Sequence, residues 1–188
     1  LFMISVVGLA DTAVKEARER VRAALRTIGI NVRGRVAVNL APADIPKEGA
    51  LLDLPIAVGI ACSQGGLTVK RPSLFLGELA LDGRLRKVRG AVPAAFLAKE
   101  NGWDLYIPEE NAPEVGLVDG VRAYIVRNLS DLFSHLRGET ELASVEKTVI
   151  GESESVTDPD LSDIKGQTFA KRALEVAAAG HHNLLFVG

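Results

Sequence analysis

The sequence has 188 residues, of which 47% are hydrophobic, and its 22 lysines and arginines nearly balance its 24 aspartates and glutamates. This composition excludes an intrinsically disordered chain, and the length suits one domain with part of another. No apolar run reaches the roughly 20 residues of a membrane-spanning helix, and no signal peptide opens the chain. The single cysteine, Cys62, cannot form an internal disulfide. We therefore expect a cytoplasmic protein with no membrane partner.

Strand and helix patterns alternate along the first 137 residues. In chain order, the spacing of apolar residues predicts a strand at 4–7, a helix at 11–28, a strand at 35–40, a buried helix at 54–63, strands at 74–81 and 84–88, a helix at 90–99, strands at 105–107 and 121–126, and a helix at 130–136. Asp11 and Asp53 stand before the first two helices as N-caps. Asp82-Gly83, between two strands, is a strong hairpin signal. This pattern predicts an α/β (α+β) fold around a sheet of mixed direction.

The composition changes after Gly138. Residues 139–160 hold seven acidic residues and one lysine, which predicts an acidic, flexible linker over 138–160. A helix at 169–179 and an apolar strand at 184–187 follow. Because the chain starts and stops within strand patterns, we expect it to be a fragment of a longer protein.

Three long segments, at 6–25, 38–60 and 75–95, carry a resemblance to a known family. They resemble the magnesium-chelatase-like AAA+ ATPases of the ComM (YifB) family, and residues 160–188 are similar to the beginning of that family's ATPase domain. The resemblance implies a first domain at 1–137 that lacks its first strands, and the linker at 138–160. It also implies the start of an AAA+ domain at 161–188, truncated before its P-loop.

A P-loop follows a buried strand and opens a glycine-rich turn whose backbone N–H groups bind phosphates. The strand at 184–187 followed by Gly188 fits the start of a P-loop. The same residues also fit a simple terminal strand without a P-loop. The family resemblance adds Ile164 and Gly166, whose equivalents lie beside the adenine. It implies ATP and Mg²⁺ as cofactors of the full-length protein and a hexameric ring of its own subunits. For these 188 residues we expect no cofactor and no ATPase activity.

The first 137 residues also resemble, more distantly, the proteolytic domain of Lon-type proteases, which has a ribosomal-protein-S5-domain-2-like fold. That domain uses a serine nucleophile in a D-G-P-S-A-G stretch and a lysine after a G-G turn. The matching positions here hold Ile56 and Val92. Neither side chain can attack a carbonyl or accept a proton. We therefore expect a protease-like scaffold without catalytic residues, which argues against an active protease.

Arginine and lysine gather in two stretches, at 15–35 and 84–89. Such stretches can neutralise phosphates. They can also form a solvated helix face and an edge strand whose charged side chains prevent pairing with another chain. The ComM family is linked with DNA branch migration during natural transformation. The resemblance therefore favours DNA as a partner, with four candidate contacts: Arg22, Arg26, Arg84 and Arg86.

Two other functions remain open. One is the motor subunit of a magnesium chelatase, which inserts the metal into a porphyrin, and the other is a protein–protein interaction module. We expect no metal site, because His181 and His182 have no cluster of further cysteine or histidine ligands.

Overall fold

The computed structural model describes residues 3–8, 11–47, 49–149 and 160–187, and the chain divides into two units, Leu1–Val149 and Ile150–Gly188. The strands are β1 (Met3–Val7), β2 (Arg35–Asn39), β3 (Ser73–Phe75), β4 (Glu78–Leu79), β5 (Leu85–Arg86), β6 (Asp104–Pro108) and β7 (Arg122–Val126). The α-helices are α1 (Thr12–Thr27), α2 (Asp53–Ser63), α3 (Ala91–Asn101), α4 (Ala112–Val115), α5 (Leu129–Arg137) and α6 (Thr168–Gly180). Short 3₁₀ helices cover Ala50–Leu52, Glu109–Asn111 and Leu161–Asp163.

Within the described residues, the strands of the first unit form three small sheets. β1 and β2 are parallel, β3, β6 and β7 form a parallel sheet with β6 in the centre, and β4 pairs with β5 antiparallel. Helices separate the parallel strands along the chain, as the α/β pattern requires. The α/β fold is therefore confirmed, whereas the expectation of one mixed sheet is wrong.

Gly77 is the reason that the predicted strand at 74–81 is divided. Its N–H donates to the Leu51 carbonyl at 3.2 Å, and its carbonyl accepts from the Leu54 N–H at 3.1 Å. These bonds tie the chain to the start of α2, so β3 ends before this glycine. A Cβ at this position would lie 2.9 Å from Leu85 Cδ2, and glycine permits this close approach. The residues on its two sides consequently pair with different strands.

Helix α1 buries one stripe of side chains, as its apolar spacing predicts. The Asp11 carboxylate caps the helix by accepting the Val14 N–H at 2.7 Å. The fully buried residues of the stripe are Val14, Ala17, Val21, Ala24 and Leu25. Both the predicted helix and its predicted cap are confirmed.

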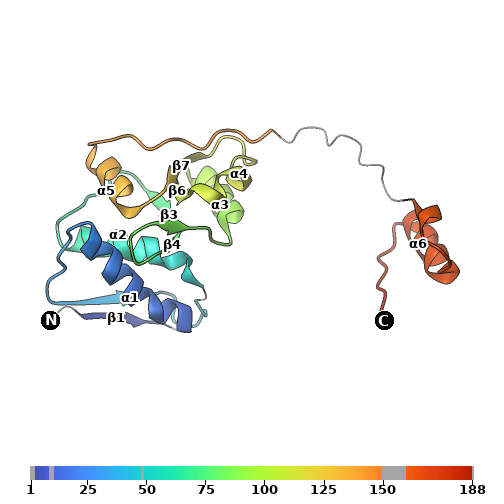
Figure 1. Ribbon diagram of the computed structural model, residues 1–188, viewed down its shortest axis with the longest axis horizontal. Helices are drawn as coiled ribbons and strands as arrows, with labels where there is room; N and C mark the ends of the chain where they lie inside the picture. The colour runs from blue at the N-terminus through green and yellow to red at the C-terminus, as the bar shows by residue number, and fades with distance from the viewer. Residues whose placement is uncertain (1–2, 9–10, 48, 150–159, 188) are drawn as a thin grey trace. The chain divides into compact units, whose positions relative to one another are not determined.

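Helix α2 is buried on most of its sides, as predicted, and lies between α1 and β3 (Figure 1). The prediction that Asp53 caps it is wrong, because Asp53 is the first helical residue and Leu52 occupies the cap position. Two apolar clusters form the core of the first unit. The first joins α1, α2 and α5, and the second packs α3 against β6 and β7.

Residues 143–148 run beside the β3–β6–β7 sheet in the first unit. The Ile125 N–H donates to the Ala143 carbonyl and the Val145 N–H donates to the Ala123 carbonyl, each at 2.8 Å. Further along, the Thr148 N–H donates to the Gly116 carbonyl at 2.9 Å. We call residues 143–148 the strap. The linker predicted at 138–160 thus includes the strap as well as residues 150–159, which lie outside the described part.

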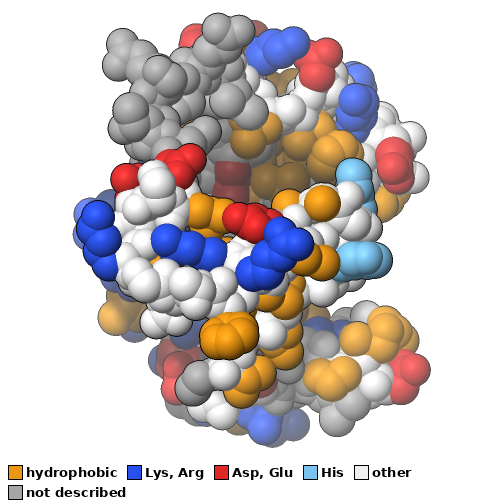
Figure 2. Space-filling view, turned by 90° about the vertical axis from the view of Figure 1, so that its right-hand side faces the viewer, with side chains coloured by type: hydrophobic (Ala, Val, Ile, Leu, Met, Phe, Trp, Pro, Cys, Tyr) orange, Lys and Arg blue, Asp and Glu red, His pale blue; other side chains and the backbone are white. Residues whose placement is uncertain are grey.

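The second unit is described over residues 160–187. Helix α6 follows the 3₁₀ helix, and none of the described residues of this unit is buried. Residues 184–187 do not form the predicted strand, and Leu185 and Val187 are exposed. The space-filling view of Figure 2 shows hydrophobic side chains at the surface among charged ones. Across the described parts of both units, no helix has the length and apolar character needed to cross a membrane.

Candidate functional site

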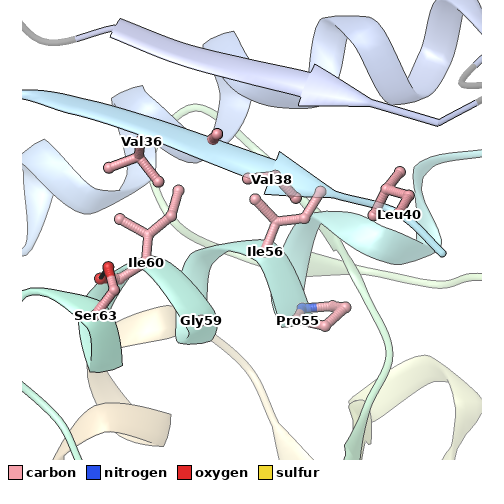
Figure 3. Close-up of a pocket in the computed structure, with 9 residues that line it drawn as sticks. Val36, Val38, Leu40, Pro55, Ile56, Gly59, Ile60 and Ser63 are labelled. Carbon is pink, nitrogen blue, oxygen red and sulfur yellow. Dashed lines mark hydrogen bonds between the residues drawn. The ribbon is translucent and has the colours of Figure 1, made fainter.

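Ile56 lies in the first turn of α2 and lines an apolar groove between α2 and β2. Its side chain and that of Ile60 point from the helix toward the strand (Figure 3). The groove has a volume of about 300 Å³ and is also lined by Val36, Ala37, Val38, Leu40, Pro55, Gly59 and Ser63. The position that resembles the Lon serine therefore presents a hydrocarbon surface.

Ser63 is the only hydroxyl-bearing residue among those that line this groove. Its Oγ donates to the Ile60 carbonyl of its own helix at 2.7 Å. A serine nucleophile needs a base within hydrogen-bond reach, and the described residues give Ser63 only this backbone partner. The groove can hold apolar groups, but it lacks an activated nucleophile.

Val92 is the second residue of α3 and packs half-buried against the second apolar cluster. The chain just before α3 is fixed by Asn111, whose side chain accepts the Val88 N–H at 3.1 Å and donates to the Val88 carbonyl at 2.8 Å. Ile56 belongs to the first cluster. The structure thus places the two protease-like positions in separate parts of the core, each used for packing.

A charged pair lies at the start of α2, where the sequence suggested only a cap. Arg20 Nε donates to Asp53 Oδ2 at 2.6 Å, and a second guanidinium nitrogen donates to Oδ1 at 3.0 Å. The Leu79 N–H also donates to Oδ2, at 3.1 Å. Asp53 is fully buried and the Arg20 side chain is 19% exposed. This pair joins α1, α2 and β4.

Two opposing influences act on the pKa of Asp53. Burial raises it from its ordinary value, whereas the hydrogen bonds from Arg20 and Leu79 lower it, and burial is the larger effect. The hydrogen bond to Asp53 also raises the pKa of Arg20. A carboxylate without exposed surface and with its oxygens bonded inside the protein cannot reach a substrate. Its role is therefore structural.

The structure brings the two predicted basic stretches together. A hollow is lined by Thr27 and Ile28 at the end of α1 and by residues 82–84 of the β4–β5 turn. However, three of the four predicted DNA contacts have a carboxylate partner: Arg22 lies 3.9 Å from Glu19, Arg84 lies 2.7 Å from Asp82, and Arg86 lies 3.5 Å from Glu78. Only Arg26 of these four has no ion pair with a described residue.

The pairing weakens the positive potential of this surface. The hydrogen bonds from the Arg84 backbone and side chain hold the pKa of Asp82 below its ordinary value, so this carboxylate stays charged beside the arginine. Each paired carboxylate cancels a charge that would otherwise attract a phosphate. Sequence spacing cannot show this cancellation, because Glu78 and Arg86 come from different strands.

The predicted nucleotide contacts lie in the second unit. Gly166 has a positive φ of 69° in the turn before α6, and the Ile164 side chain is 46% exposed. The Lys171 ammonium donates to the Ile164 carbonyl, which fixes this turn to the helix. Gly188 lies outside the described residues. Neither unit holds, within its described part, a group of three or more metal-ligating side chains.

Comparison with known proteins places the chain among magnesium-chelatase-related sequences. Residues 1–111 match the family model described as subunit ChlI of Mg-chelatase, and residues 160–188 match the model described as magnesium chelatase, subunit ChlI. The competence protein ComM of Haemophilus influenzae is 42% identical over 98% of this chain, and YifB of Escherichia coli is 40% identical over the same share. The chain spans about 37% of the length of these curated relatives.

A weaker similarity links the chain to a protease. Lon protease 2 of Bacillus subtilis is 25% identical over 65% of this chain and 22% of its own length. The ChlI model covers more than half of the 188 residues, and the matches to ComM and YifB extend over nearly all of them. The chain therefore belongs to the ComM/YifB family of magnesium-chelatase-like proteins.

Proposed function

We propose that the first unit is a non-catalytic, Lon-like scaffold of an ATP-driven motor that remodels DNA. The observation that carries this proposal is the groove at Ile56, where hydrocarbon side chains occupy the place of a nucleophile. The name of the competence protein ComM, a relative at 42% identity, supports a role in DNA uptake or recombination. In the full-length protein we expect a hexameric ring that drives branch migration.

The scaffold would act through its rigid core. Arg20 and Asp53 fix α1, α2 and β4 relative to one another, and Asn111 fixes the segment before α3. A unit held in this way can carry a binding surface without changing shape. Cutting a peptide bond would in addition require a nucleophile and a base in contact.

ATP and Mg²⁺ would supply the driving reaction in the full-length protein. The turn at Ile164 and Gly166 can contact a nucleobase, because both residues are exposed. The described residues contain no group of three or more histidine, cysteine, aspartate or glutamate side chains that could hold Mg²⁺. We therefore assign no step of ATP hydrolysis to residues of this chain.

Branch migration of a four-way DNA junction tests the proposal. The full-length protein should convert a labelled junction to duplex products only with ATP and Mg²⁺. The chain of 188 residues should release no phosphate and digest no casein. Cleavage of casein that a serine reagent blocks would refute the scaffold role, and junctions left intact by the full-length protein would refute the motor role.

A magnesium-chelatase motor is the second candidate. The descriptions of both family models favour it, since they name a chelatase subunit. The two candidates differ in what stimulates the ATPase of the full-length protein: branched DNA for a DNA motor, or porphyrin with chelatase partner subunits for a metal-insertion motor. A third candidate, an interaction module, would gain support if neither branched DNA nor porphyrin with chelatase partner subunits stimulated this ATPase.

A further inference from the structure

A ladder of aromatic rings crosses the parallel sheet of the first unit. Phe75, Tyr106 and Tyr124 occupy matching register positions on β3, β6 and β7. The Phe75 and Tyr106 rings stack at 4.9 Å with an angle of 8°, and the Tyr106 and Tyr124 rings stack at 5.2 Å with an angle of 20°. His135 of α5 approaches the Tyr124 ring at 5.3 Å. Three strands and helix α5 thus build one aromatic surface.

This surface opens into a pocket of about 190 Å³. The pocket is lined by Val69, Lys70, Arg71, Ser73, Asp104, Tyr106, Tyr124, His135, Leu136 and Gly138. Its volume is below the usual range of sites for drug-sized molecules, so it suits a single ring. Tyr124 and His135 are half-exposed, so part of each residue can contact a ligand.

The hydrogen bonds of His135 define what the pocket offers to a ligand. Its Nδ1 accepts the Leu142 N–H at 3.2 Å, so the proton of the neutral ring lies on Nε2. The pocket therefore combines aromatic faces with a ring N–H donor. Nucleobases carry acceptors on their edges and stack on such rings.

Two cations at this pocket, unlike Arg84 and Arg86 near the β4–β5 turn, have no carboxylate partner among the described residues. Lys70 lines the pocket. Arg137 stands in the chain between the lining residues Leu136 and Gly138, and its guanidinium donates to the Gly66 carbonyl at 3.4 Å. Both side chains are exposed.

The one carboxylate in the pocket is already neutralised. Asp104 accepts from Arg71 at 3.1 Å and from Arg122 at 2.8 Å, which leaves this group of three with a net positive charge. The pocket therefore does not repel a phosphate. Positive charge around an aromatic pocket is the arrangement that binds single-stranded nucleic acid.

We propose that this pocket binds single-stranded DNA, with one unpaired base against Tyr124 and His135 and the neighbouring phosphates on Lys70 and Arg137. The proposal rests on the proposed DNA-remodelling function for its choice of DNA as the nucleic acid. It moves the DNA contact of the first unit away from the paired arginines of α1 and the β4–β5 turn. A base must leave its stack to enter the pocket, so a duplex should bind more weakly.

Fluorescence anisotropy with a labelled oligo(dT) of about 20 nucleotides tests this with the chain of 188 residues. Tyr124→Leu should weaken binding at least about fivefold, because the base loses its stacking partner, and Tyr124→Phe should restore it. The combined variant Lys70→Ala, Arg137→Ala should weaken binding and reduce the salt slope of log K by about 1.4, for two lost phosphate contacts. The control Arg84→Ala, Arg86→Ala should change both quantities much less.

Three results would overturn the proposal: no binding of the oligonucleotide, equal losses in the control, or equal affinity for a duplex of the same length. Circular dichroism of each variant verifies that it is folded. The proposed function is measured separately by branch migration. If junctions migrate while the pocket variants bind the oligonucleotide normally, the pocket proposal is refuted and the motor proposal stands. If the pocket variants lose binding while no junction migrates, the motor proposal is refuted and the pocket proposal stands.

Discussion

Arg20 and Arg84 form hydrogen bonds of nearly equal length to an aspartate, 2.6 Å and 2.7 Å, in opposite surroundings. Asp53 is fully buried between α1, α2 and β4, whereas the Asp82 side chain at the β4–β5 turn is 52% exposed. An exposed pair is screened by water and stabilises a fold little. Removing one member of a buried pair leaves an uncompensated charge inside the protein. Burial, and not bond geometry, therefore decides what each arginine does.

The largest effect is expected from Asp53→Ala. This change leaves the Arg20 guanidinium and the Leu79 N–H without their shared acceptor, which should lower the free energy of unfolding by about 3–5 kcal/mol. Urea denaturation followed by circular dichroism measures the loss. The matched control, Asp82→Ala, should unfold at nearly the wild-type midpoint. Similar losses in both variants would contradict the comparison.

Replacing both members of the buried pair tests whether the pair itself contributes net stability. In Arg20→Met, Asp53→Leu no charge remains buried, and apolar groups of similar size fill the space. The Leu79 N–H still loses its acceptor, so we expect a loss of about 1–2 kcal/mol, less than for Asp53→Ala alone. The same urea titration applies. A double variant less stable than Asp53→Ala would show that the pair itself supplies net stability.

Burial should also shift the pKa of Tyr106, whose side chain is uncharged at neutral pH. Burial, with a further contribution from Asp104, raises its pKa to about 12. Because the folded pKa exceeds the unfolded value of about 10, this group stabilises the fold fully below pH 10 and loses that contribution as the pH approaches 12. In Tyr124→Phe, Tyr106 is the single tyrosine, and its absorbance change should appear near pH 12. A change centred near pH 10 would refute the prediction.

The smallest effect is expected from Arg84→Ala. Asp82 keeps its hydrogen bond from the backbone N–H of residue 84 at 3.1 Å, and water replaces the guanidinium. The thermal midpoint should therefore stay unchanged at both low and high salt, as differential scanning calorimetry can show. A clear drop at low salt would mean that the exposed pair supports the fold.

The sequence predicts those elements whose pattern is local. The apolar stripe of α1 and its Asp11 cap follow from spacing alone, and so does the glycine that ends α5. The division at Gly77 is different, because it depends on Leu51 and Leu85, which contact this glycine only after folding. The predicted strand at 184–187 likewise needs neighbouring strands, and the described residues provide none.

The candidate sites were less predictable than the fold, for the same reason. Asp53 has the sequence position of a cap, and its true partner Arg20 lies 33 residues away. The charges of the predicted DNA contacts are visible in the sequence, whereas the pairing of Arg86 with Glu78 across β4 and β5 is not. The aromatic ladder depends on the register of β3, β6 and β7, which a single sequence does not reveal.

The strap determines how the first unit responds to a pulling force on the chain that follows it. Its bonds to the body of the unit lie in sequence, with Thr148 bound to Gly116 at its far end and Val145 bound to Ala123 before it. A pulling force on the chain after residue 149 would act first on the hydrogen bond of Thr148. It would act on the sheet only after the strap had separated from it. A motor that pulled on this polypeptide would thus break the hydrogen bonds of the strap before it deformed the rest of the unit.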